Sequence, residues 1–145
     1  MQMTNNDGLY FELKSNGDVL RVDLIGLSHP NAQLEFDRRW IKSLVTLKAG
    51  GFSGEFKCEL RIDDFKNFMD ELLVLYDKLD GTALFETLEG QLTINIKGDG
   101  NGHLEANCSA MDFVGTGNKL DFEISFDQTI ILRMVQQLET IANTF

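Results

Sequence analysis

The sequence is poor in several residue types, and each shortage argues against a class of structure. A single proline among 145 residues, with no low-complexity run, argues against a disordered or linker-rich chain. Two histidines and two cysteines without CxxC spacing do not form a recognisable zinc site. No segment approaches the ~20 apolar residues that a membrane-spanning helix needs. We therefore expect one globular domain over residues 1–145, with residues 1–7 frayed, and neither a metal nor a cofactor.

The two cysteines and the first ten residues bear on the cellular compartment. Cys58 and Cys108 each occupy an apolar phase of an alternating pattern, which favours buried, reduced thiols over a disulfide. The opening MQMTNNDGLY has neither the basic start nor the apolar run of a secretion signal. The predicted location is therefore the cytoplasm, without membrane attachment.

Positive charge is also scarce, and the shortage is confined to one part of the chain. The net charge is −10 at pH 7. Residues 1–50 contain six acids and six bases, whereas residues 51–145 contain 17 acids and seven bases. Such a surface repels phosphate backbones, which makes direct binding of nucleic acid an unfavourable hypothesis. Net negative charge also keeps small proteins soluble, so the charge alone does not establish a partner.

The clearest element in the sequence is a helix over Asp63–Leu79. Its apolar residues recur at three- and four-residue spacing and fall on one face: Phe65, Phe68, Met69, Leu72, Leu75, Tyr76 and Leu79. The opposite stripe is mostly acidic, with an apolar residue near its centre: Lys66, Asn67, Asp70, Glu71, Val74, Asp77 and Lys78. We expect Asp63 to cap the start of this helix and Gly81 to end it in a left-handed conformation.

Alternating patterns and turn residues predict eight strands around this helix and a second one. Asn16-Gly17 is a strong hairpin signal, and Asp127 is placed to cap the helix that follows it. The predicted strands are Leu9–Lys14, Val19–Leu27, Leu34–Lys48 with a break near residues 37–39, Gly54–Ile62, Leu84–Leu88, Leu92–Lys97, Leu104–Met111 and Leu120–Phe126. Short connections require antiparallel pairing. The fold class is therefore α+β, with about eight antiparallel strands in a curved or two-layer sheet and two helices in the order ββββαββββα.

No catalytic motif emerges from the residues. The glycine-rich stretch at residues 98–103 has the wrong spacing for an EF-hand calcium loop, since the sixth and twelfth places counted from Asp99 hold Leu104 and Ala110. It also lacks the lysine of a phosphate-binding loop, and a hairpin turn explains it better. No GxSxG nucleophile elbow occurs. We predict that the protein is not an enzyme.

The remaining functional signal in the sequence is the charge of the predicted surface. Residues 63–99 contain nine acids and three lysines, and the acidic helix face has Val74 at its centre. Apolar contact flanked by steering carboxylates is typical of some partner-binding surfaces, although an ordinary solvated helix has the same pattern. The candidate partner-binding residues are Asp70, Glu71, Val74, Asp77, Glu86 and Glu89.

Several short motifs are spread along the chain: Trp40-Ile41, the run from Gly51 to Phe56, the run from Leu60 to Phe65, the run from Leu79 to Ala83, the run from Gly98 to His103, and Phe126-Asp127-Gln128-Thr129. Together they resemble the WapI-type family of bacterial immunity proteins. The motifs are turn glycines and core positions, so the resemblance carries over no catalytic residue.

The resemblance implies a cytoplasmic protein that neutralises the toxin domain of a contact-dependent, wall-associated toxin by binding it. If that domain is a nuclease, its basic surface would be complementary to an acidic partner. Three alternatives remain open. The chain could be a small-ligand-binding or other protein-interaction module, a hydrolase with a site formed only in the fold, or a subunit of an oligomer.

Overall fold

The computed structural model describes residues 9–145, so the predicted fraying of residues 1–7 lies outside the described residues. The elements are β1 (Tyr10–Ser15), β2 (Asp18–Leu27), α1 (Glu35–Arg38), β3 (Trp40–Ala49), β4 (Phe52–Arg61), α2 (Ile62–Lys78), β5 (Asp80–Glu86), β6 (Leu92–Asp99), β7 (His103–Met111), β8 (Lys119–Asp127) and α3 (Thr129–Thr144). This order confirms the predicted α+β class.

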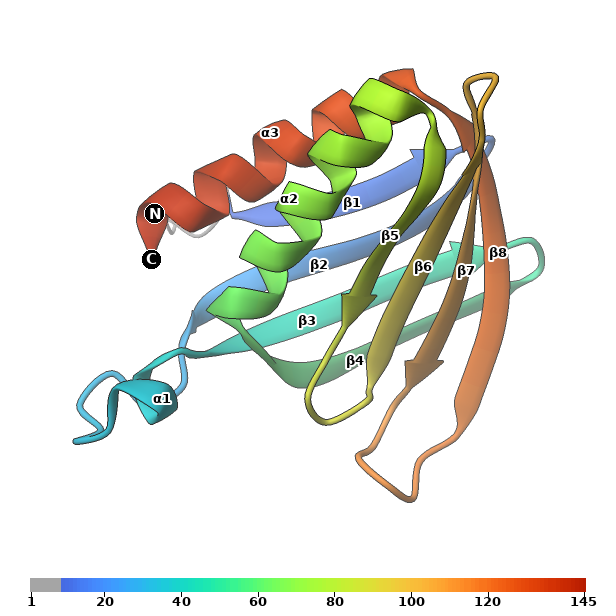
Figure 1. Ribbon diagram of the computed structural model, residues 1–145. Coiled ribbons are helices and arrows are strands. Elements are labelled where there is room, and N and C mark those ends of the chain that lie inside the picture. Colours follow the sequence, from blue (N-terminus) through green and yellow to red (C-terminus); the bar gives the residue numbers. More distant parts are fainter. Residues whose placement is uncertain (1–8) are drawn as a thin grey trace, which may run out of the picture.

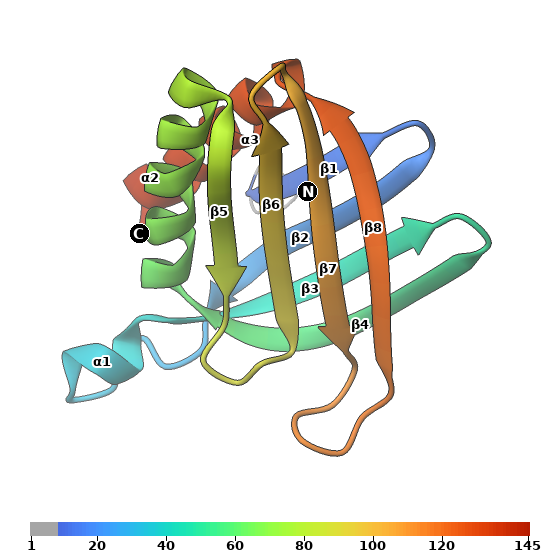
Figure 2. The ribbon, with the colours of Figure 1, turned by 45° about the vertical axis from the view of Figure 1, so that its right-hand side comes forward.

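The strands form two separate antiparallel sheets of four, one from each half of the chain. The first sheet has the order β1-β2-β3-β4, and the second has the order β5-β6-β7-β8. Strands of the two sheets cross at a steep angle, with the second sheet in front of the first in one view (Figures 1 and 2). Of the two predicted arrangements, a single curved sheet or two layers, the structure has two layers.

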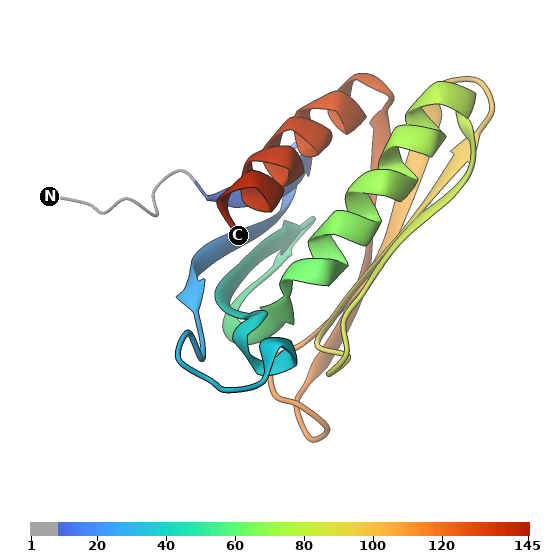
Figure 3. The same ribbon diagram turned by 60° about the vertical axis from the view of Figure 1, so that its left-hand side comes forward.

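Each long helix follows the last strand of one sheet and packs beside the first strand of the other. α2 follows β4 and lies along β5, whereas α3 follows β8 and lies along β1. The two helices lie next to each other on the same side of the molecule (Figure 3). One side chain of each helix also bonds to the edge of the neighbouring strand. Glu71 Oε1 of α2 accepts the backbone N–H of Leu84 in β5 at 2.9 Å, and Gln137 Oε1 of α3 accepts that of Glu12 in β1 at 2.8 Å. Both strand edges would otherwise present unpaired donors.

Four phenylalanines join the two sheets to α2 at the centre of the core. Phe11 of β1, Phe65 and Phe68 of α2 and Phe85 of β5 are fully buried. Their ring centroids lie 5.4–6.1 Å apart in edge-on and tilted arrangements. Such pairs add to the apolar burial of each ring. The apolar face predicted for α2 therefore faces both sheets, although Tyr76 at its margin is 36% exposed.

Several local predictions are confirmed. Asn16 and Gly17 both have positive φ, 53° and 88°, and they connect β1 to β2 as a two-residue hairpin turn. Cys58 and Cys108 are buried free thiols. The N-cap of α3 is Gln128, so the capping position predicted at Asp127 is one residue early, although Asp127 Oδ1 accepts the backbone N–H of Thr129 at 3.0 Å.

Both end signals predicted for α2 are wrong by a residue or two. The helix begins at Ile62, and the carboxylate that bonds back to its start is Asp64, whose Oδ2 accepts the N–H of Arg61 at 3.3 Å. Asp63 is instead held by arginine side chains. At the other end, Leu79 takes the left-handed conformation with φ 59°, and Gly81 already lies in β5.

The reversal at Leu79 also moves the predicted strand boundaries. Because the chain turns immediately after α2, β5 begins at Asp80 and ends at Glu86, earlier than the predicted Leu84–Leu88. The Leu79 carbonyl accepts the N–H of Gly100 from the β6–β7 turn at 2.8 Å. A Cβ on Gly98 would overlap that same carbonyl, so a glycine is needed there.

The extended chain predicted from Leu34 is also wrong in its first residues. Residues 35–38 form the short helix α1, which has no buried residue, and the third strand begins at Trp40. One turn of helix is too short to produce a periodic pattern, so α1 had no signal in the sequence.

Candidate partner-binding surface

The acidic stripe of α2 faces outward over much of its length. Asp70 and Asp77 are exposed, and Val74 between them is 55% exposed. This stripe has the character predicted from the sequence, namely an apolar side chain flanked by carboxylates. Whether it binds a partner stays a prediction.

Glu71 differs from its neighbours because its carboxylate serves the fold. It accepts the Leu84 N–H and covers the free edge of β5. A substitution at Glu71 would therefore disturb β5 as well as surface charge, and Glu71 is a poor position for testing binding.

Glu86 and Glu89 lie away from the outer stripe of α2. Glu86 ends β5 and shares a hollow of about 550 Å³ with Asp64, in the first turn of α2. Asp77 lies 13 residues further along the helix, which corresponds to roughly 20 Å at 1.5 Å per residue. Glu89 lines a different hollow, of about 480 Å³, together with Lys42 and Lys57. The six predicted residues therefore do not form one contiguous site.

The acidic surface extends over the second sheet, of which the sequence analysis had proposed only Glu86 as a candidate residue. Its four strands contain two lysines and seven carboxylates, all exposed: Asp80, Glu86, Asp99, Glu105, Asp121, Glu123 and Asp127. The four strands of the first sheet contain five carboxylates and six cations. The molecule thus has one acidic sheet and one nearly neutral sheet. Alternation in β7 and β8 was the signal that could have identified Glu105, Asp121 and Glu123 as outward-facing.

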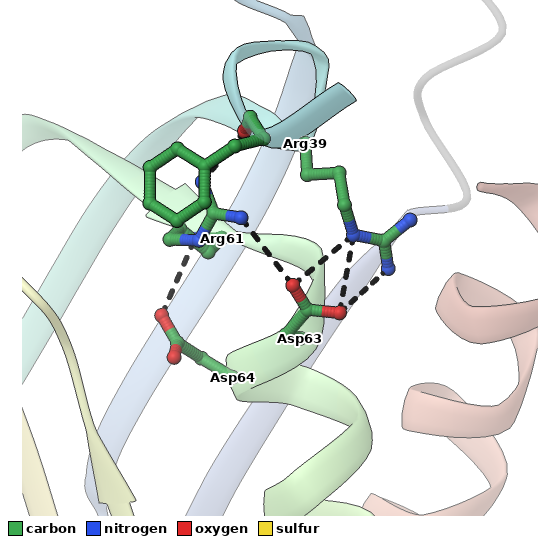
Figure 4. A network of polar contacts seen from close by, with 5 residues as sticks. Arg39, Arg61, Asp63 and Asp64 are labelled. Carbon is green, nitrogen blue, oxygen red and sulfur yellow. Dashed lines mark hydrogen bonds and ion pairs between the residues drawn. The ribbon is translucent and has the colours of Figure 1, made fainter. Parts of the chain in front are cut away.

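A network of polar and aromatic groups joins α1 to the first turn of α2 (Figure 4). Arg39 donates from Nη2 to Asp63 Oδ1 at 2.7 Å and from Nε to both carboxylate oxygens at 3.1 Å. Arg61 donates from Nη1 to the Phe36 carbonyl at 2.8 Å and from Nη2 to Asp63 Oδ2 at 3.4 Å. The Arg61 guanidinium carbon lies 3.5 Å from the Phe36 ring centroid and 5.2 Å from that of Trp40. This network fixes a segment that has no buried residue of its own.

The pKa values of the two neighbouring carboxyl groups in this network, Asp63 and Asp64, are shifted in opposite directions. The hydrogen bond from Arg39, with its positive charge, lowers the pKa of Asp63 below its usual value. Burial raises the pKa of Asp64, because the charged form loses hydration there. Asp63 is therefore a satisfied carboxylate, whereas for Asp64 the cost of burial outweighs the N–H bond and the nearby charge of Arg61.

The two cysteines have the properties of buried structural thiols. Burial raises the pKa of both Cys58 and Cys108 to about 12, so neither is a reactive thiolate near neutral pH. Among residues 9–145, no three His, Cys, Asp or Glu side chains gather as a metal site would require. Within the same range, no helix combines the length and apolarity needed to cross a membrane.

A protein-family model described as immunity protein WapI-like matches residues 10–145. The chain belongs to the WapI-like immunity protein family. The match spans every strand and helix described above, and it confirms the resemblance found in the sequence. Membership supports an immunity function for this WapI-like protein, and it agrees with a role that requires no catalytic site.

Other comparisons add little to the family match. No curated protein matches the sequence of this WapI-like chain. Among solved structures, it is similar to a chain from the crystal structures of Trypanosoma bruciei MRP1/MRP2, at 10% sequence identity and a TM-score of 0.49. That alignment covers 90% of this chain and 76% of the other.

Proposed function

We propose that this WapI-like protein acts in the cytoplasm by binding a cognate toxin domain and covering a basic, nuclease-like surface on it. Family membership over residues 10–145 is the observation that carries the proposal. The negative charge of the second sheet and of the outward stripe of α2 is opposite to that of a basic toxin surface, which supports the proposal. Complementary charge raises the association rate and disfavours other partners. Inhibition by coverage needs no catalytic group on the immunity protein.

The first test is recovery and use of the partner. The tagged chain is purified from its native host while the toxin is expressed, washed at low and then at high salt, and co-purifying proteins are identified by mass spectrometry. Each recovered protein is then produced in a bacterial host with and without this chain. We expect a basic domain that is toxic alone and harmless when co-produced. Recovery of an unrelated enzyme, or toxicity that co-production does not relieve, would overturn the proposal.

The second test addresses the outer stripe of α2. Asp70→Lys with Asp77→Lys should weaken binding of the recovered domain, because both positions are exposed and the change adds positive charge to the contact. Glu71 is left intact because it bonds to β5. The matched control is Glu55→Lys with Glu59→Lys on β4, which changes the net charge equally on the nearly neutral sheet. Equal effects of the two pairs would place the contact elsewhere.

A further inference from the structure

The hollow that contains Glu86 is bounded by groups from both halves of the chain. Its lining includes Phe36 of α1, Asp64 of α2 and Leu88 of the β5–β6 turn. Phe36 is 54% exposed and Leu88 is 66% exposed, so two large apolar side chains stand at its rim. Scattered exposed apolar residues are ordinary, but two around one concave site form a place where an apolar stem can pack.

Both walls of the hollow are held in place by specific hydrogen bonds. The Arg61 guanidinium bonds to the Phe36 carbonyl and lies against the Phe36 ring, which fixes the α1 wall. On the other wall, the Gly90 N–H donates to the carbonyl and to Oγ1 of Thr87, each at 3.1 Å. Gly90 has φ 75°, as this tight turn requires. Walls that are already ordered lose little conformational entropy when a ligand binds.

The charge left uncompensated in this hollow is negative. Arg61, Asp64 and Glu86 all line the hollow, so two carboxylates face one guanidinium, and that guanidinium already donates to the Phe36 carbonyl and to Asp63. The Glu86 carboxylate forms no hydrogen bond or ion pair with any other residue in 9–145, and only one carboxylate oxygen of Asp64 accepts a hydrogen bond within that range. Burial has also raised the Asp64 pKa, which a bound cation would reverse.

We propose that this hollow receives an arginine side chain of the toxin domain, with its methylene stem against Phe36 and Leu88 and its guanidinium between Glu86 and Asp64. The proposal rests on the proposed function for the identity of the partner. Arginine fits better than lysine because its planar fork can donate to two carboxylates at once and its stem covers apolar surface. An anionic ligand would meet two carboxylates and a guanidinium that already donates to the Phe36 carbonyl and to Asp63.

The hollow can be tested without any toxin. A five-residue peptide, acetyl-Gly-Gly-Arg-Gly-Gly-amide, is titrated into the ¹⁵N-labelled protein, and the same peptide with citrulline in place of arginine serves as an uncharged control of equal shape. We expect saturable amide shifts concentrated at residues 86–90 with the arginine peptide only. Glu86→Gln should abolish them, whereas Glu55→Gln, an equal change on β4, should leave them intact. Shifts spread over α2 and β8, or shifts unaffected by Glu86→Gln, would overturn the proposal.

Affinity for the recovered toxin domain tests whether the hollow serves the immunity function. Glu86→Gln should weaken that affinity on the order of 30-fold, the lower end of the effect of truncating one partner of a buried hydrogen-bonded charge pair. Glu55→Gln, on the nearly neutral sheet, should change it much less. If the toxin binds wild type and both variants equally, this hollow is not the contact although the proposed function stands. If the peptide binds as expected but no toxin is neutralised, the proposed function fails although the hollow binds arginine.

Discussion

Replacing Arg61 by methionine should destabilise the protein by about 3 kcal/mol, although Arg61 lies at the end of a surface-facing strand. The side chain is only 8% exposed. Its hydrogen bond to the Phe36 carbonyl is charge-assisted, a type that contributes about 1.5–3 kcal/mol. Its contact with the Phe36 ring at 3.5 Å adds about 1 kcal/mol, because the Phe36 side of this cation–π pair is 54% exposed. The contact with Asp63 adds little, because that carboxylate is 47% exposed and keeps Arg39.

The assay is urea unfolding followed by circular dichroism, with wild type and variant compared at one pH. In thermal unfolding, the same loss of about 3 kcal/mol corresponds to a decrease in Tm of roughly 10 °C for a chain of this size. Methionine keeps most of the side-chain volume, so the loss reports the polar and cation–π contacts more than a cavity.

Arg21→Met is the matched control, because Arg21 also combines ion pairs with an aromatic contact. It pairs with Glu12 and Asp23 and lies 3.8 Å from the Tyr10 ring centroid, but it is 35% exposed. Solvent screening should limit its loss to less than about 1 kcal/mol. If Arg61→Met costs no more than Arg21→Met, burial does not strengthen the network and the reasoning is refuted.

Two further predictions follow from single positions. Gly98→Ala should destabilise by about 2 kcal/mol or more in urea unfolding, because its methyl would overlap the Leu79 carbonyl, whereas Gly51→Ala has open space and should be nearly neutral; equal losses would contradict this. At pH 8 neither Cys58 nor Cys108 should react with a thiol reagent until the protein unfolds. Their pKa of about 12 against the ordinary 9.0 reduces the thiolate fraction about 1,000-fold, and fast labelling of the native protein would contradict the assignment.

The helices and the alternation of the strands were predictable because they depend on local periodicity. The Asn16-Gly17 hairpin and the apolar face of α2 needed only neighbouring residues. The cap of α2 was different. Two adjacent carboxylates both fit the start of a helix, and Asp63 is engaged by Arg39, which lies 24 residues earlier in the chain. A partner that arrives by tertiary folding leaves no local signal.

The extent of the candidate surface was predictable only in part. The stripe of α2 followed from helical spacing, and the outward residues of β7 and β8 could have been added from strand alternation. The hollow beside Glu86 could not, because it forms where α1 approaches the β5–β6 turn. The role of Glu71 on the edge of β5 likewise required the packing of α2 against the second sheet.

The affinity of the purified protein for the recovered toxin domain, measured by calorimetry across a series of salt concentrations, tests the central claim most directly. If the acidic surface of α2 and the second sheet covers a basic surface, the dissociation constant should rise steeply with salt. Added salt screens the attraction, because the Debye length falls from about 10 Å at 0.1 M to about 3 Å at 1 M. Asp121→Lys with Glu123→Lys should flatten that dependence, whereas Glu55→Lys with Glu59→Lys should not. A dissociation constant that changes neither with salt nor with charge reversal would contradict the account.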